Sequence, residues 1–343
     1  MSTEALDEAV ARARGGADLS RDQAAGALAV IMAGEADDEQ IRDLLLALRE
    51  KGETPDELAG MAQTMRALAS EVRPKREDLL DTCGTGGGRQ TFNISTAAAL
   101  VAAGAGCAVA KHGNRTATGL TGSADVLEEL GVALDLEPRA EAELIDELGF
   151  GFMFAPAHHA ATRYVVPVRK ALGVSTIFNL LGPLTNPAGA RRQLIGVWEP
   201  GRLDIVAGAL AELGTEHALV VSSLDGIDEI SISGPTAARE VRGNAVHELT
   251  ITPGDLGLPE SPPEAVPGGD AAESARVITA VLAGEPGPAR DIVVANAAAA
   301  IHVAGGAPSL GEAAEKAAAA IDSGSARDVL AAYVERSREM AGR

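Results

Sequence analysis

The chain has 343 residues, and 49 Asp and Glu against 29 Lys and Arg give it a formal net charge of −20 at pH 7. This balance excludes a basic nucleic-acid surface of the usual kind, because a phosphate backbone is bound by an excess of Lys and Arg. Apolar residues make up 46% of the chain and aromatic residues 2%, so we expect a sizeable core built from Ala, Leu, Val and Ile.

The first 72 residues are predicted to be helical throughout. A capping box, in which two side chains satisfy each other's backbone N–H groups, opens a helix at Ser20–Gln23. Asp37–Gln40 opens the next helix, and Thr54–Glu57, with Pro55 at the first helical position, opens a third. The first two of these helices are expected to end at Gly34 and near Gly52. Short helices bury little apolar surface alone, so we expect them to pack against a later part of the chain or a second subunit.

Strands and helices alternate after the charged linker at 73–78. The predicted strands are Leu79–Thr82, Cys107–Ala110, Phe150–Phe154, Gln193–Trp198 and Ala218–Ser222. The predicted helices start at Thr96 and Ser123 or cover Pro138–Leu148, Leu203–Leu213 and most of Ala271–Met340. This alternation predicts an α/β fold with a mostly parallel central sheet.

The sequence also favours a cytoplasmic location. Its two cysteines, Cys83 and Cys107, are too few for a disulfide framework. The start, MSTEALDEAV, is acidic and polar, unlike a secretory signal. The longest run of small apolar residues, Thr96–Ala110, is too short to span a membrane. We therefore expect a protein of the cytoplasm with no membrane partner.

A glycine loop separates the first predicted strand from the next helix. Its sequence, Asp81-Thr-Cys-Gly-Thr-Gly-Gly-Gly88, lets the backbone approach a ligand, and the helix start adds the positive end of a dipole. Thr91 and Asn93–Thr96 bring hydroxyl and amide groups to the same place. This favours a phosphate or diphosphate site, with a flexible turn and plain capping at Ser95 or Thr96 as the alternative.

Two further segments follow predicted strands, where ligand sites form in α/β folds. Lys111-His-Gly-Asn-Arg115 offers cations for an anion clamp in an otherwise acidic chain; alternatively, His112 only bridges backbone groups in a loop. Asp225-Gly-Ile-Asp228-Glu229 offers the oxygen ligands that suit Mg²⁺, or else it is an acidic surface turn.

In their order along the chain, these segments resemble the family of anthranilate phosphoribosyltransferases. The resemblance rests on Asp81–Gly88, Thr91–Thr96, KHGNR at 111–115, GSADVLEELG at 122–131, Phe154-Ala-Pro with His159, Pro167-Val-Arg169, Asn179–Pro187 and Asp225–Ser231. It covers roughly residues 79–231, and the helical N-terminus agrees with it.

The resemblance implies a small helical domain of residues 1–72, completed by helices at about 160–188, and an α/β domain of residues 76–155 and 190–343. The large domain has the nucleoside-phosphorylase-like phosphoribosyltransferase architecture. The implied reaction joins anthranilate to phosphoribosyl diphosphate, an early step of tryptophan biosynthesis, and releases diphosphate. It uses Mg²⁺, expected as two ions per subunit, in a homodimer formed through the helical domain.

Site residues carry over position by position as what the resemblance implies. Phosphoribosyl diphosphate is expected at Gly84, Gly87, Gly88, Thr91, Asn93, Ile94, Ser95, Thr96, Lys111, His112, Gly113, Asn114, Arg115, Gly119 and Ser123. Anthranilate is expected at Gly84, Asn114 and Arg169, with Arg169 on its carboxylate. The metal is expected at Ser95, Asp228 and Glu229. No side chain is assigned as a general acid, general base or nucleophile.

The chain departs from the family pattern in two loops. Gly88 stands where the family often has Asp, and the stretch from Gly87 to Thr91 is one residue shorter than in common members. After KHGNR the chain has Thr118-Gly119 in place of the usual Ser-Ser. These departures affect the part of the glycine loop that the resemblance places in contact with the metal and the diphosphate.

Two alternative functions remain open from the sequence. A pyrimidine-nucleoside phosphorylase of the same architecture would use inorganic phosphate and a nucleoside, but KHGNR and Asn179–Pro187 favour the anthranilate family. A non-catalytic relative that binds nucleic acid is disfavoured by the charge of −20 and by the Asp228–Glu229 pair.

Overall fold

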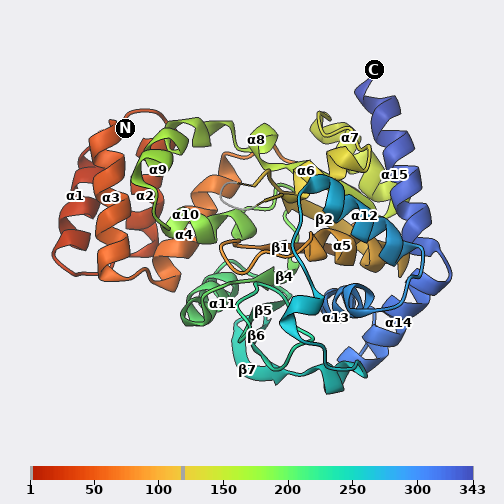
Figure 1. Ribbon diagram of the computed structural model, residues 1–343. Coiled ribbons are helices and arrows are strands. Elements are labelled where there is room, and N and C mark those ends of the chain that lie inside the picture. The colour runs from red at the N-terminus through yellow and green to blue at the C-terminus, as the bar shows by residue number, and fades with distance from the viewer. Residues whose placement is uncertain (1–2, 117–119, 343) are drawn as a thin grey trace.

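The computed structural model describes residues 3–116 and 120–342, with a helical bundle at one end and a helix-covered sheet at the other (Figure 1). Its first helices are α1 (Glu4–Arg14), α2 (Arg21–Met32), α3 (Asp38–Lys51), α4 (Pro55–Ala67), α5 (Ile94–Gly104), α6 (Ser123–Glu129) and α7 (Pro138–Leu148). The later helices are α8 (Ala155–His158), α9 (Val166–Leu172), α10 (Ile177–Leu181), α11 (Leu203–Glu212), α12 (Ala271–Leu282), α13 (Pro288–Val303), α14 (Leu310–Asp322) and α15 (Ser325–Ala341). The strands are β1 (Leu79–Gly84), β2 (Ala108–Gly113), β3 (Phe150–Phe154), β4 (Arg192–Gly196), β5 (His217–Ser223), β6 (Thr236–Arg242) and β7 (Ala245–Ile251).

The helical bundle is built from two separate parts of the chain, the N-terminal helices α1–α4 and the later helices α9 and α10. The helix starts predicted at Ser20, Asp37 and Thr54 are confirmed, and each of α2, α3 and α4 begins with a capping box. The later helices α9 and α10 lie against these N-terminal helices in Figure 1 and share their buried apolar cluster. The N-terminal helices therefore bury their apolar faces partly against a segment that follows about a hundred residues later.

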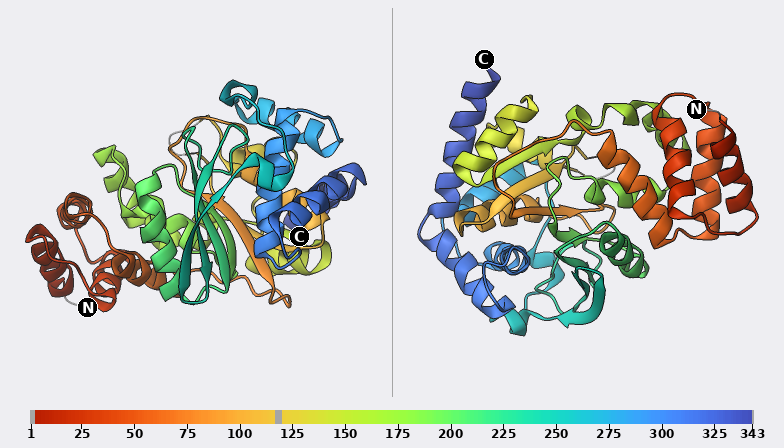
Figure 2. Two further views of the ribbon diagram at one scale, coloured as in Figure 1. Left: turned by 90° about the horizontal axis from the view of Figure 1, so that it is seen from below. Right: turned by 180° about the vertical axis from the view of Figure 1, so that it is seen from behind.

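Within the described residues, seven strands form one sheet in the order β3-β2-β1-β4-β5-β6-β7. The pairings from β3 through β5 are parallel, and β5–β6 and β6–β7 are antiparallel. Figure 2 shows helices on both faces of this sheet. The mostly parallel α/β architecture predicted from the alternation is confirmed.

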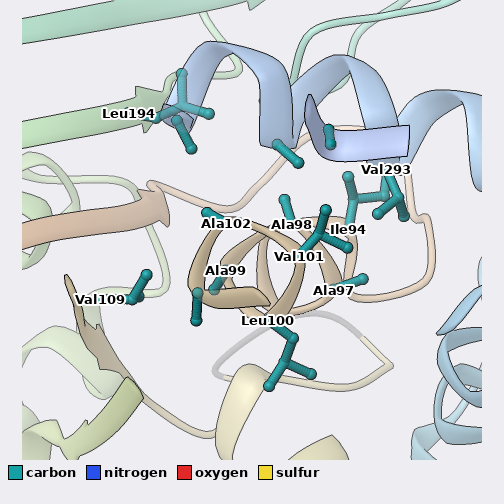
Figure 3. Close-up of a cluster of buried hydrophobic side chains, with 14 of the residues drawn as sticks. Ile94, Ala97, Ala98, Ala99, Leu100, Val101, Ala102, Val109, Leu194 and Val293 are labelled. Atoms are coloured by element: carbon teal, nitrogen blue, oxygen red, sulfur yellow. The ribbon is translucent and has the colours of Figure 1, made fainter. Parts of the chain in front are cut away.

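Alternate residues of the central strands supply two separate cores. Leu194 and Leu219 point to the cluster built by α5 and α13, whereas Ile195 and Val220 point to the cluster shared by α11 and the helical bundle. Figure 3 shows the first cluster, in which α5 and α13 pack against each other beside the sheet. The end of α5 also lies close to α15, where a Cβ at Gly104 would be 2.6 Å from the backbone nitrogen of Ala326.

Two local expectations differ from the structure. The strand expected to end at Ala110 continues to Gly113, so Lys111 lies within β2 and not in the loop after it. The hairpin β6–β7 was not predicted, because the side chains of β7 are nearly all outside the core and leave little apolar pattern. None of the helices in residues 3–116 and 120–342 combines the length and apolar composition that crossing a bilayer requires.

Candidate active site

The candidate site lies where the order of the parallel strands reverses. Strand β1 is bonded to β2 on one side and to β4 on the other, so the loops after β1 and β4 run in opposite directions. A crevice at the carboxyl ends of such strands is the usual ligand site of an open α/β sheet. The glycine loop follows β1, and the acidic segment Asp225–Glu229 follows β5 at the same edge.

The glycine loop is fastened to the acidic segment by three contacts. The Gly86 backbone N–H donates to Asp228 Oδ2 over 2.9 Å. The Arg89 backbone N–H donates to the carbonyl of Gly226 over 2.7 Å, and the Arg89 guanidinium lies 3.2 Å from Asp225 Oδ2. The two segments, about 140 residues apart in the chain, therefore form one wall of the site.

The contacts between these two segments leave no room for side chains on the glycine loop. A Cβ at Gly84 would lie 2.3 Å from Asp228 Oδ2, and one at Gly88 would lie 2.5 Å from the carbonyl oxygen of Gly226. At Gly196, next to the loop on β4, a Cβ would lie 1.6 Å from the Asp228 carbonyl oxygen. The glycine at position 88, where the family often has Asp, thus suits the shortened loop of this chain.

Lys111 lies beneath the site and is only 1% exposed. Its ammonium group donates to the carbonyl of Thr82 and to Ser95 Oγ, the latter over 3.3 Å. Burial lowers the pKa of Lys111, while the negative charges of Asp81 and Glu229 act in the opposite direction. Lys111 therefore supplies positive potential from below the site and does not project into solvent as a free clamp.

The two carboxylates of the acidic segment suit a divalent cation. Burial, and next the charge of Asp228, raise the pKa of Glu229 to about 8, against the opposing effects of Lys111 and the Ser95 backbone N–H. Burial also raises the pKa of Asp228. Two crowded carboxylates and the Ser95 hydroxyl offer the hard oxygen donors that Mg²⁺ prefers, so these residues fit that ion.

The start of α5 contributes backbone groups and few side chains. Ser95 Oγ faces Lys111, and Thr91 and Asn93 are half-buried. The Asn93 Oδ1 and Thr96 Oγ1 atoms are buried without a hydrogen-bond partner among the described residues. Ile94 belongs to the apolar core, so only its backbone can contact a ligand.

His112 forms a buried pair with His159 beside the site. Their ring centroids are 5.2 Å apart, and His112 Nδ1 lies 3.2 Å from the carbonyl of Gly182. Burial lowers the pKa of both rings, that of His159 to about 4. Both Nε2 atoms lack a partner in the described part of the chain, so the pair offers neutral ring nitrogens and no positive charge.

The segment after β2 divides between the site and the surface. A Cβ at Gly113 would lie 2.2 Å from Ser123 Oγ, and that hydroxyl donates to the Asn114 carbonyl over 3.3 Å. The exposed Arg115 is held by two carboxylates of α6 and is not directed at the glycine loop by any contact among the described residues. Gly119 lies outside the described residues.

Arg169 lies next to Asn179, which lines a cavity between the glycine loop and the helical bundle. Its guanidinium lies 3.4 Å from Asn179 Oδ1 and 5.3 Å from the centroid of the Phe178 ring. Burial lowers the pKa of Arg169, and among the described residues no carboxylate forms an ion pair with it. The cavity has an empty volume of about 300 Å³, part of which is open to solvent, and it is lined by Glu53, Thr85, Ser175, Thr176, Asn179, Leu180, Val197, Trp198, Glu199 and Arg202.

Three residues of the site were not singled out from the sequence. Arg89 binds Asp225 from within the glycine loop, and a Cβ at Gly87 would lie 2.8 Å from Trp198 Nε1. Asp81 is fully buried and accepts the His112 backbone N–H over 3.0 Å. The sequence carried a signal for two of these residues. Arg89 is an arginine inside a glycine loop, and Asp81 is a carboxylate at the start of that loop.

Comparison with known proteins agrees over nearly the whole chain. A model of the glycosyl transferase family α/β domain matches residues 76–327, and a model of the helical bundle domain of the same family matches residues 7–69. The anthranilate phosphoribosyltransferase of Symbiobacterium thermophilum is 53% identical over 329 residues, 96% of this chain and 95% of the relative. That of Rubrobacter xylanophilus is 51% identical over 340 residues, 98% of this chain and 99% of the relative.

Solved structures agree as well. The anthranilate phosphoribosyltransferase of Thermus thermophilus superposes with a TM-score of 0.91 at 45% identity, covering 96% of this chain and 99% of the other. The enzyme of Saccharomyces cerevisiae, in complex with PRPP and Mg, gives a TM-score of 0.90 at 26% identity and covers 98% of this chain and 99% of the other. Another yeast structure holds 4-fluoroanthranilate.

Proposed function

The chain belongs to the family of anthranilate phosphoribosyltransferases, and from this premise we propose the reaction of its cleft. The phosphoribosyl group of 5-phosphoribosyl 1-diphosphate is transferred to the amine of anthranilate. The products are N-(5-phosphoribosyl)anthranilate and diphosphate, and the step belongs to tryptophan biosynthesis. The chain is a transferase of the glycosyltransferase class.

The observation that carries this function is a convergence at one sheet edge. The glycine loop, Lys111 and the Asp228–Glu229 pair meet there. Thr85 of the loop and Asn179 line the same cavity, and Asn179 is in contact with Arg169. Backbone N–H groups and a buried cation suit a diphosphate. A desolvated guanidinium without a carboxylate partner among the described residues suits the carboxylate of anthranilate.

The residues support the reaction by position and charge. The bond from ribose C1 to the diphosphate oxygen breaks, its electron pair leaves with diphosphate, and the amine nitrogen bonds to C1. Negative charge grows on the leaving group, so loop N–H groups and Lys111 stabilise the transition state more than the ground state. An aryl amine is already neutral at pH 7, so it needs orientation more than deprotonation, and its proton leaves after attack.

Mg²⁺ use is supported by the yeast relative solved with PRPP and Mg. When bound, the ion would neutralise charge on the diphosphate oxygens. Ser95, Asp228 and Glu229 are the residues that would hold it, because they place hard oxygen donors together at the glycine loop. We propose two ions per subunit, since the diphosphate offers a second set of oxygens beside the pair of carboxylates.

Domain division, assembly and location complete the proposal. The helical domain comprises residues 1–72 with helices at about 160–188, and residues 76–155 and 190–343 form the α/β domain. The apolar cluster that α9 and α10 share with α1–α4 supports the assignment of these two later helices to the helical domain.

We propose a homodimer formed through the helical domain, whose exposed Leu68 and Val166 support an apolar contact there. The protein acts in the cytoplasm.

The test mixes purified protein, MgCl₂, anthranilate and phosphoribosyl diphosphate and follows the loss of anthranilate fluorescence. Activity is expected only with all components present, and omission of either substrate or of Mg²⁺ is the control. Phosphorolysis of thymidine or uridine by the same protein, without consumption of anthranilate, would instead support a pyrimidine-nucleoside phosphorylase.

A further inference from the structure

Three side chains of metal-ligand type meet at the opposite end of the parallel strands from the cleft. His217 begins β5, Glu240 lies on β6, and His302 lies in the last turn of α13. His217 Nε2 is 2.8 Å and His302 Nε2 is 3.8 Å from Glu240 Oε1, and the three ligand atoms lie within 4.8 Å of one another. Six residue steps of β5 place this cluster about 20 Å from the catalytic edge.

The three side chains of the cluster are largely buried but keep some exposure to solvent. The side chains of His217, His302 and Glu240 are 10%, 14% and 20% exposed. The two imidazole rings meet edge to face with centroids 5.3 Å apart. Partial burial of this kind removes most competing water and leaves an entry path and a place for one solvent ligand.

One imidazole is already oriented as metal-binding histidines are. His302 Nδ1 lies 3.0 Å from the carbonyl of Ala307, and a carbonyl can only accept, so Nδ1 carries the proton. This contact fixes the ring so that Nε2 faces the Glu240 carboxylate. A backbone carbonyl on the far nitrogen is a common support for metal-binding histidine.

The carboxylate of Glu240 already attracts positive charge in this structure. Arg242 Nη2 is 2.7 Å from Glu240 Oε1, but its side chain is 52% exposed and can turn into solvent at little cost. His217 Nε2 lies within hydrogen-bond distance of Glu240 Oε1, so a metal ion bound there takes the place of the proton between these two atoms.

We propose that His217, Glu240 and His302 form a second metal site, which binds a transition-metal dication such as Zn²⁺. Two imidazoles and one carboxylate form a ligand set that zinc uses, and imidazole discriminates against Mg²⁺. Ligand atoms of a tetrahedral zinc site are about 3.3 Å apart, so small side-chain rotations bring these three into range, with water as the fourth ligand. The ion would join β5, β6 and α13 and stabilise the α/β domain.

The test measures metal binding by the full-length protein after EDTA treatment and its removal. Excess MgCl₂ keeps the cleft carboxylates occupied while Co²⁺ is titrated and its visible absorption followed, and Zn²⁺ binding is measured by calorimetry. We expect one Zn²⁺ per chain and an intense tetrahedral Co²⁺ spectrum. His302→Ala and Glu240→Gln are each expected to weaken Zn²⁺ binding at least about a hundredfold, since loss of outer-sphere partners alone costs about 10–100-fold.

Two controls separate this site from others. His247→Ala changes the exposed histidine opposite Glu240 in the β6–β7 pairing; because this ring is not one of the three proposed ligands, the variant is expected to bind Zn²⁺ as the unmodified chain does. Asp228→Asn with Glu229→Gln is expected to leave Zn²⁺ binding intact, because the cleft is a different site. Zn²⁺ binding that survives His302→Ala, or that is lost with the Asp228 and Glu229 changes, would overturn the proposal, as would absence of binding by the unmodified chain.

Discussion

Arg169 shows how a single residue can indicate the chemistry of its ligand. A half-buried guanidinium, with a pKa lowered by burial and no ion-pair partner in the described part of the chain, carries an electrostatic cost that a bound anion would offset. Its one polar side-chain contact in that part is the weak bond to Asn179 at 3.4 Å. These observations support the proposal that Arg169 binds the carboxylate of anthranilate.

Arg169→Ala is expected to raise the KM for anthranilate about ten- to a hundredfold, since a hydrogen bond to a charged group contributes about 1.5–3 kcal/mol. Steady-state kinetics at saturating phosphoribosyl diphosphate measure this. Arg169→Lys keeps the charge without the planar fork and should give an intermediate KM. Arg163→Ala, at an exposed arginine nearby, is the matched control. An unchanged KM in Arg169→Ala would contradict the assignment.

The acidic pair at 228 and 229 is predicted to govern Mg²⁺ dependence. Asp228→Asn combined with Glu229→Gln preserves the size of each side chain and one acceptor oxygen on each but removes both charges. Turnover should fall at least about a hundredfold, because loss of outer-sphere partners alone typically costs about 10–100-fold in metal sites. Rates measured across a range of MgCl₂ concentrations check this, with Glu260→Gln as an exposed control. A double variant with normal rates at normal Mg²⁺ would refute the metal assignment.

The buried His159 makes stability depend on pH. Its pKa is about 4 in the folded chain, because burial and then the charge of His158 disfavour the protonated ring, and about 6.5 in the unfolded chain. Between these values the unfolded state binds more protons, so the stability present above about pH 6.5 is lost progressively as the pH falls to about 4. The loss from this ring, which is 6% exposed, is about 3 kcal/mol.

Urea unfolding at a series of pH values between about 4 and 7 measures this effect. His159→Asn retains an amide near the Thr185 backbone but cannot take up a proton, so the slope of unfolding free energy against pH should decrease by up to about one proton. His112 keeps part of the slope, since its pKa is lowered as well. A variant with the slope of the unmodified chain would show that His159 is not the titrating group.

At the scale of secondary structure, two glycines in the helical bundle have opposite roles. Gly60 of α4 crosses α2 so closely that a Cβ would lie 2.1 Å from the carbonyl oxygen of Arg21. Gly26, within α2 itself, has nothing within 4 Å of the corresponding position. The first glycine sets the spacing between two helices, and the second only weakens its own helix.

Gly60→Ala should therefore destabilise the chain by about 1–3 kcal/mol through overpacking against backbone. Gly26→Ala should stabilise it by up to about 1 kcal/mol through helix propensity. Chemical unfolding of both variants, in parallel with the unmodified chain, gives the comparison. If both changes shifted stability in the same direction, the close crossing of α2 and α4 would not be the cause.

The sequence predicts a helix or strand well where the signal comes from residues that are close together in the chain. The caps at Ser20, Asp37 and Thr54 are formed by residues three positions apart, and all three are present. The hairpin β6–β7 has no such signal, because β7 buries only Ile251 and is held by pairing with β6. The motifs likewise indicated that the glycine loop and the segment Asp225–Glu229 meet. They did not indicate that Lys111 is buried, since that depends on the length of β2.

At the scale of the molecule, the helical bundle and the sheet are not independent. One apolar cluster includes Leu28 of the bundle, Val206 of α11 and Val220 of β5. Arg202 pairs with Glu53, whose side chain is 1% exposed, across the same junction. Removing either part would expose the shared cluster, so each part depends on the other for its stability.

The chain is therefore expected to unfold in one transition, although a protein of this length often shows intermediates. Trp198 is the single tryptophan and lines the cavity at the junction, so its fluorescence should change at the same urea concentration as the far-UV circular dichroism. Arg202→Ala leaves Glu53 without its partner and should cost about 3–5 kcal/mol, moving both curves together. Helical signal lost at lower urea than the fluorescence change would show that the bundle unfolds separately, and the shared cluster would then not join the two parts.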